Sequence, residues 1–256
     1  MKSIISILII LTFFNTTLSA KDNYFNPYKP IKSKNITKKR VKTAKIVKKV
    51  KKKWKKRVKH RKKFVKKSSK LPKSLDRIYR RVLKKTNINR KALRKAFSFY
   101  KKNRVKRGLS SKYLAIADYT KTAKNKRLYI INLRNGAVYR HKVAHGKYSG
   151  SMGGKVRRSS NRRNTNMTPY GFFKIGSKVQ KTKKRHYKYL SVKGLERSNR
   201  KVGYPPRMGG RDIILHPAKY VNYGGRSHGC FSICPQDRYA IFAKLKKALL
   251  YSYTGR

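Results

Sequence analysis

The sequence predicts a mainly β fold, a sandwich of strands with peripheral helices, over residues 108–256. Three observations support this prediction: apolar runs of strand length recur along this region, turn-forming residues separate them, and the chain holds 18 tyrosines, which favour strands. A region of about 150 residues is the size of one ordinary domain. The segments that precede it have a different character and are considered first.

Residues 1–20 have the composition of a secretory signal. Lys2 provides a positive start, residues 4–14 are apolar, and Leu18-Ser19-Ala20 offers a cleavage site of small residues. The apolar run is too short to span a bilayer, which disfavours an uncleaved anchor. We therefore expect an exported protein of the periplasm or cell envelope, or a secreted one, without a transmembrane anchor after cleavage.

Residues 21–70 are rich in lysine and arginine. Runs such as Lys51-Lys52-Lys53 leave too little apolar surface to offset the entropy of folding, so we expect a disordered arm. Two interpretations of this arm stay open, a solvated tether and a segment that binds polyanions. Trp54 alone is too little for a platform that stacks nucleic-acid bases.

The charge of the whole chain indicates its partners. The sequence has 74 Lys and Arg against 6 Asp and Glu, a formal net charge of +68, which implies anionic partners. Behind an export signal the candidates are peptidoglycan, through its stem carboxylates, and anionic envelope polymers, whereas nucleic acid is disfavoured. The sequence does not indicate the oligomeric state.

The scarcity of acidic residues also excludes classes of enzyme. The six are scattered, so the paired carboxylates of a glycosidase are hard to build. No His-Glu-x-x-His sequence occurs and the six histidines do not cluster with acids, which disfavours a zinc hydrolase. We expect neither a metal nor another cofactor.

Residues 71–107 predict a helical lead-in. Apolar residues recur at steps of three and four in two groups, Leu75, Ile78, Tyr79 and Val82, then Leu93, Ala96, Phe97 and Tyr100. Asn87-Ile88-Asn89 is a break that can also cap the second helix. We expect the apolar face of each helix to pack against the domain at 108–256.

Within that domain, the strand-like runs are residues 113–119, 127–133, 137–143, 172–175, 189–192 and 212–215. Asn135-Gly136 predicts a hairpin turn between the second and third runs. Asp118 in the first run is expected to make a local structural hydrogen bond.

The end of the domain predicts a helix. Pro235 and Asp237 can open it, and its apolar face would hold Ile241, Phe242, Leu245 and Leu249. Residues 248–253 fit either the end of this helix or a last strand, and the sequence leaves both open.

The candidate chemistry lies around Cys230. A cysteine is a good nucleophile as a thiolate, which a nearby base or positive charge must favour. His216 closes the apolar run 213–215, and a glycine-rich passage leads from it to Cys230. The end of a strand fixes an imidazole, and glycine lets backbone N–H groups approach a reacting carbonyl. Two interpretations follow: a cysteine acyl-transfer site, or a packing thiol beside a structural histidine.

The sequence Ser227-His228-Gly229-Cys230, downstream of a strand-borne His216, resembles the signature of the murein L,D-transpeptidase catalytic domain family. Members of this family are cysteine enzymes that remodel peptidoglycan. Three more segments resemble the family in the same order, residues 143–150, 168–173 and 190–195. Phe231 departs from the family, which has a small residue or proline there, as does the short interval between His216 and Ser227. The resemblance implies the same β-sandwich fold.

The resemblance also implies catalytic roles. Cys230 would form a thioester with the third residue of a stem tetrapeptide, and His216 would be the base, oriented by the backbone carbonyl of Pro217. Backbone N–H groups of Gly229 and Cys230 would form the oxyanion hole. His228 would shape that loop or bind substrate, with a structural hydrogen bond in the loop as the alternative.

Substrate-binding residues are implied as well. Arg226 would hold a stem carboxylate beside Ser227, and Tyr170 and Gly171 would line the cleft. Cys234 is expected to be a buried thiol. The acceptor stays open between an amine, which makes an L,D-transpeptidase, and water, which makes an L,D-carboxypeptidase. The alternative function is a catalytically inactive, cationic wall-polymer-binding protein on the same scaffold.

Overall fold

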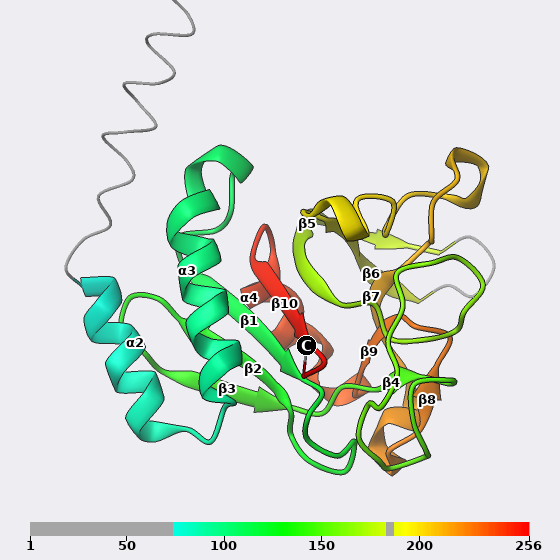
Figure 1. Ribbon diagram of the computed structural model, residues 1–256, viewed down its shortest axis with the longest axis horizontal. Coiled ribbons are helices and arrows are strands. Elements are labelled where there is room, and N and C mark those ends of the chain that lie inside the picture. The colour runs from blue at the N-terminus through cyan, green and yellow to red at the C-terminus, as the bar shows by residue number, and fades with distance from the viewer. Residues whose placement is uncertain (1–73, 183–186, 256) are drawn as a thin grey trace, which may run out of the picture. The chain divides into compact units, whose positions relative to one another are not determined.

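The structure is a computed structural model that describes residues 74–182 and 187–255, all within one compact unit (Figure 1). The signal sequence expected at 1–20 and the basic arm expected at 21–70 lie outside the described residues. Within the described residues, no helix has both the length and the apolar composition needed to span a membrane.

One sheet of eight strands organises this unit, in the order β3-β2-β1-β10-β5-β6-β7-β9. Its strands are β1 Tyr113–Asp118, β2 Leu128–Asn132, β3 Val138–His141, β5 Gly171–Lys181, β6 Lys188–Gly194, β7 Ile214–Pro217, β9 Phe231–Ile233 and β10 Leu249–Tyr253. A second sheet pairs β4 (His145–Gly146) with β8 (Arg226–Ser227) in parallel. This mainly β fold with two sheets and few helices confirms the predicted fold class.

The last strand resolves the choice that the sequence left open. Residues 249–253 form β10, which pairs in parallel with β1 and antiparallel with β5. The expectation that Leu249 extends the apolar face of the preceding helix is wrong, because helix α4 (Arg238–Leu245) ends four residues earlier. Lys247 takes a positive φ of 59°, which turns the chain out of the helix. All five residues of β10 are buried, so a central strand gives both of its faces apolar contacts.

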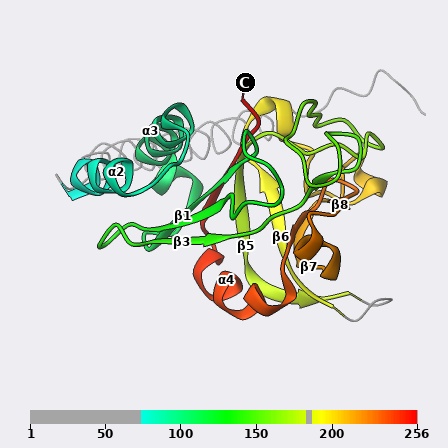
Figure 2. The ribbon, with the colours of Figure 1, turned by 90° about the horizontal axis from the view of Figure 1, so that it is seen from below.

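Two helices cover one face of the sheet and α4 covers the other (Figure 2). Helix α2 spans Ser74–Lys85 and α3 spans Arg90–Arg107, which confirms the two helices predicted there. Alternate residues of β1 take part in two separate cores. Leu114 and Ile116 pack with α2 and α3, whereas Ala115 and Ala117 pack with α4.

Asn89 joins the helical segment to the sheet. Its side chain accepts hydrogen bonds from the backbone N–H groups of Lys91 and Ala92, so it is the predicted N-cap of α3. Its own N–H donates to the buried carboxylate of Asp118 over 3.1 Å. Asp118 also accepts from the N–H and hydroxyl of Thr120, which confirms its expected structural role.

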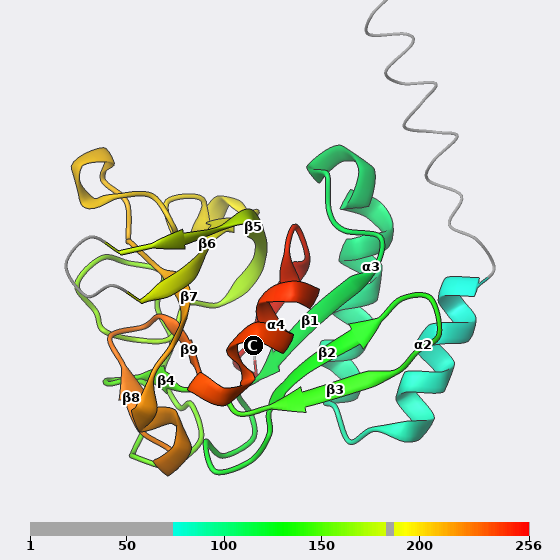
Figure 3. The same ribbon diagram turned by 180° about the vertical axis from the view of Figure 1, so that it is seen from behind.

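The elements that carry the candidate site gather away from α2 and α3, at the β6–β7–β9 side of the sheet (Figure 3). Strands β7 and β9 pair in parallel, with Leu215 opposite Phe231 and His216 opposite Ser232. The connection between them holds the 3-10 helix η3 (Lys219–Tyr223) and β8. Three further 3-10 helices are η1 (Arg197–Asn199), η2 (Pro206–Met208) and η4 (Pro235–Asp237).

Candidate active site

His216 is fixed at the end of β7 by its own backbone neighbour. Its Nδ1 lies 3.0 Å from the carbonyl oxygen of Pro217. A carbonyl oxygen only accepts, so Nδ1 carries the hydrogen and a neutral imidazole has its lone pair on Nε2. The ring also stacks on Tyr187, with centroids 5.0 Å apart and planes at 26°. The imidazole is therefore oriented as an acceptor at Nε2.

A hydroxyl lies at that acceptor. Oγ of the fully buried Ser232 is 3.1 Å from Nε2 of His216, and it is also 2.7 Å from Oη of Tyr220. Ser232 and Tyr220 were not predicted as site residues, because their contacts depend on the pairing of β7 with β9 and on the course of η3.

Cys230 immediately precedes β9, the strand that pairs with the strand of His216. Its Sγ lies 4.0 Å from the carbonyl oxygen of Asp212, a long contact for a thiol donor. Burial raises the pKa of the Cys230 thiol; a backbone hydrogen bond from Ile214 lowers it, the Asp212 carboxylate raises it, and the Arg211 guanidinium lowers it. The thiol is thus protonated at neutral pH and needs a base to become a nucleophile.

Hydrogen bonds of Ser227 stabilise the turn that leads to Cys230. The Ser227 hydroxyl is buried and donates to the carbonyl oxygen of Cys230 over 2.9 Å. The N–H of Gly229 in turn donates to Ser227 Oγ over 3.0 Å. Ser227 and Gly229 therefore hold the turn together from inside, while His228 between them is exposed.

The Arg211 guanidinium packs against this turn at Gly229. Arg211 was not predicted as a site residue from the sequence. Its buried guanidinium donates to the carbonyl oxygens of Ser160 and Met167. Gly229 has a φ of 114°, and a Cβ at this position would collide with the Arg211 guanidinium and the Met167 carbonyl. Burial lowers the pKa of Arg211 to about 10, and the nearby Cys230 opposes this shift. Arg211 thus remains a cation near the thiol at neutral pH.

Arg226 lies on the outer side of the same turn, where β8 pairs with β4. Its Nη1 donates to the carbonyl oxygens of Lys147 and Gly150, over 3.2 and 3.4 Å. It borders a pocket of about 340 Å³ that Lys147, Arg157 and Arg158 also line, together with uncharged residues. This pocket therefore suits an anionic group.

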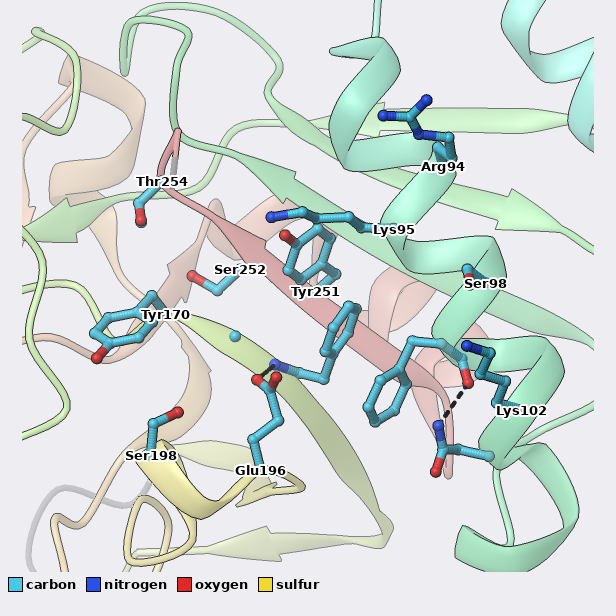
Figure 4. A pocket seen from close by; sticks show the side chains of 14 residues that line it. Arg94, Lys95, Ser98, Lys102, Tyr170, Glu196, Ser198, Tyr251, Ser252 and Thr254 are labelled. Atoms are coloured by element: carbon cyan, nitrogen blue, oxygen red, sulfur yellow. Dashed lines mark hydrogen bonds between the residues drawn. The ribbon is translucent and has the colours of Figure 1, made fainter.

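Tyr170 and Gly171 belong to a different pocket, shown in Figure 4. This cavity of about 660 Å³ lies between α3 and the start of β5, and Cys230, His216 and His228 are not among its lining residues. Tyr170 lies on one side of it, and Lys95 and Lys102 project from α3 on the other (Figure 4). Tyr170 and Gly171 therefore line this pocket, and their expected place in a cleft beside Cys230 stays a prediction.

Cys234 is 3% exposed and precedes η4, which agrees with the buried thiol that was expected. Cys230 and Cys234 are both free thiols. Across residues 74–182 and 187–255, no group of three or more His, Cys, Asp or Glu side chains is arranged to hold a metal ion.

The family model described as the L,D-transpeptidase catalytic domain matches residues 84–253, and the chain therefore belongs to this family. This match confirms the family that the sequence motifs resemble, and it extends from the end of α2 to β10. No curated protein matches the chain.

Among solved structures, the chain is similar to the L,D-transpeptidase (residues 123-326) from Xylanimonas cellulosilytica DSM 15894. The two are 14% identical with a TM-score of 0.30. The similarity covers 56% of the present chain and 61% of the length of the other.

Proposed function

We propose that this protein is a peptidoglycan L,D-transpeptidase that acts on stem peptides through a thioester at Cys230. With water in place of the acceptor amine it is an L,D-carboxypeptidase. The observation that carries the proposal is the orientation of His216, whose Nδ1 donates to the Pro217 carbonyl and whose Nε2 is left as an acceptor beside the strand of Cys230. Membership of the L,D-transpeptidase catalytic domain family supports the same reaction class.

In the proposed reaction, the thiol proton of Cys230 moves to Nε2 of His216, and Sγ attacks the carbonyl carbon of the third stem residue. The carbon–nitrogen bond to D-Ala then breaks, and the leaving nitrogen takes the proton from His216. The acceptor amine, or water, attacks the thioester and gives a proton to Nε2, and Sγ leaves as the thiolate. The Cys230 N–H is the proposed oxyanion donor, because the Gly229 N–H is engaged by Ser227.

The proposed substrate contacts are electrostatic. Arg226 and the basic pocket beside it would hold a carboxylate of the stem, and His228 is exposed where it can contact the peptide. Tyr170 and Gly171 would bind substrate in the pocket that they line beside α3. The net charge of +68 suits peptidoglycan and anionic envelope polymers as partners, and we propose an exported enzyme of the periplasm or cell envelope.

One observation favours the second candidate, a catalytically inactive wall-polymer-binding protein. Sγ of Cys230 contacts the carbonyl oxygen of Asp212. An inactive scaffold would keep this arrangement when substrate binds. The enzyme requires the thiol to reach Nε2, so the two candidates differ in whether Cys230 reacts.

The test is to treat peptidoglycan sacculi with the purified protein, digest them and identify the muropeptides by mass. The enzyme converts tetrapeptides to cross-linked products, or to tripeptides when water is the acceptor. Cys230→Ala should abolish this conversion, whereas Cys234→Ala, its matched control, should keep most of it. A carbapenem adduct should map to Cys230. Unchanged sacculi with wild-type protein would support the inactive scaffold, and an adduct on Cys234 would overturn the site.

A further inference from the structure

The hydroxyl of Ser232 is held between an imidazole and a phenol. Its Oγ lies 3.1 Å from Nε2 of His216 and 2.7 Å from Oη of Tyr220. Directly paired residues of neighbouring strands project from the same face of a sheet, and His216 is paired with Ser232. The contact between them is therefore built into the register of β7 and β9.

At rest, the hydrogen bonds that link Tyr220, Ser232 and His216 all run in one direction. Nδ1 of His216 donates to the Pro217 carbonyl, so Nε2 accepts, and the Ser232 hydroxyl donates to it. Ser232 Oγ then accepts from the Tyr220 phenol. Burial raises the pKa of Tyr220, which keeps the phenol protonated and able to donate.

We propose that Ser232 and Tyr220 are positioning residues for His216, which hold its imidazole as an acceptor at rest and reverse their hydrogen bonds when it is protonated. This inference rests on the proposed function. A hydroxyl can donate or accept, so the reversal moves no proton between these groups.

With their directions reversed, the same hydrogen bonds accommodate His216 when its imidazole is protonated. Nε2 has one lone pair, so the Ser232 hydrogen turns away from it before the S–H bond of Cys230 breaks and an N–H bond forms at Nε2. The negative charge then stays on sulfur, and the new N–H donates to Ser232 Oγ. The Ser232 hydrogen turns to Tyr220 Oη, and the phenol hydrogen turns to solvent, which the 36% exposed Tyr220 can reach. Neither charge state of His216 leaves a buried polar group without a partner, so the imidazolium is stabilised.

Valine and threonine have nearly the same shape and differ in the hydroxyl, so they separate the hydrogen bond from packing. Both suit a strand position such as 232. Ser232→Val should lower kcat on a soluble tetrapeptide muropeptide by about ten- to a hundredfold with little change in KM, because it removes one charge-assisted hydrogen bond. Ser232→Thr should stay within about threefold of wild type, and Tyr220→Phe should fall between the two.

A readout other than turnover distinguishes this inference from the proposed function. Alkylation of Cys230 by iodoacetamide reports its thiolate, and His216→Ala is the reference for loss of the base. We expect Ser232→Val to slow alkylation toward that reference and Ser232→Thr to leave it near wild type. Equal behaviour of the Val and Thr variants, or faster reaction of Ser232→Val, would overturn the role of the hydroxyl. Absence of wild-type turnover with the expected alkylation pattern would overturn the proposed function alone.

Discussion

Arg127 and His145 share a buried hydrogen bond, with Nη2 of Arg127 2.9 Å from Nδ1 of His145. The guanidinium only donates, so the imidazole accepts at Nδ1 and is neutral. Other nitrogens of Arg127 donate to the carbonyl oxygens of Val143 and Lys121. Arg127 thus fixes β4, which pairs with β8 at the base of the cysteine turn.

This pair predicts a loss of stability in acid. Burial, with the charge of Arg127 next in size, lowers the pKa of His145 from 6.5 to about 4. A lowered pKa stabilises the fold above pH 6.5, and this contribution is lost as the pH falls through 6.5 toward 4. Between pH 7.5 and 4.5 the loss should be roughly 2 to 3 kcal/mol.

Urea unfolding of the wild type and of His145→Asn at both pH values checks this prediction. The Asn side chain can accept from Arg127 but does not titrate. The variant should therefore lose less stability between the two pH values than the wild type. Equal losses would mean that His145 does not carry the acid sensitivity.

Gly229→Ala should disable the cysteine turn. The added methyl group meets the Arg211 guanidinium and the Met167 carbonyl, and a φ of 114° is unfavourable for alanine. Displacement of Cys230 by about 1 Å can cost on the order of a hundredfold in turnover. Gly209→Ala is the matched control, because Gly209 also has a positive φ, 66°, but its nearest neighbour is 4.0 Å away. Muropeptide turnover similar in both variants would contradict this account of the turn.

Arg211 should affect both stability and thiol reactivity. Arg211→Met leaves the Ser160 and Met167 carbonyls without their donor, at a cost of roughly 3 kcal/mol. It also removes a charge that lowers the pKa of Cys230, so alkylation at pH 8 should slow. Arg211→Lys keeps the charge but not the double contact. Arg211→Lys should therefore be less stable than wild type, while the rate of Cys230 alkylation stays closer to that of wild type. An unchanged alkylation rate in Arg211→Met would disprove the effect of the Arg211 charge on Cys230.

The contribution of the Asn89 N-cap of α3 to the free energy of unfolding should be measurable. Asn89→Ala removes the acceptor for the N–H groups of Lys91 and Ala92, which costs ~1 kcal/mol of unfolding free energy. Asn89→Asp keeps an acceptor for these N–H groups and should cost less unfolding free energy than Asn89→Ala. Denaturant unfolding compares the three proteins. Full stability in Asn89→Ala would show that the side-chain contacts are not needed.

Deleting residues 21–70 should weaken binding to sacculi without changing turnover of a small soluble muropeptide. The described unit holds every proposed catalytic group, while the arm carries dense positive charge. Polycation binding falls steeply with salt because counterions are released and charges are screened over about 10 Å at 0.1 M. Pull-down at rising salt and soluble-substrate kinetics on the same truncated protein check this. Loss of soluble turnover in a folded truncation would place the arm in the active site.

The contacts that the sequence could predict are those between neighbours in the chain. Asn89 caps the helix that follows it, and Pro217 accepts from the histidine that precedes it. Ser232 contacts His216, and Tyr220 contacts Ser232, only through the register of two strands and an intervening loop, which no local pattern encodes. Arg211 could not be singled out, because the chain holds 74 lysines and arginines.

The fold class was predictable for a similar reason, because the alternation of apolar and polar residues and the turn-forming residues are local signals. The assignment of Leu249 to a helix failed because a short run that is apolar on both sides fits a buried strand and a buried helix equally well. What decided between them was the position between β1 and β5, a tertiary property. Likewise, the placement of Tyr170 and Gly171 beside α3 depends on how the helices cover the sheet.

The central position of β10 has a consequence for the order of folding. Leu114 of β1 pairs with Leu249, so the middle of the sheet joins its first strand in the sequence to its last. Until β10 arrives, the facing edges of β1 and β5 have no partner, and exposed edges invite pairing with other chains. Contacts so distant in sequence also form slowly. The eight-stranded sheet therefore cannot close until residues 249–253 have been synthesised.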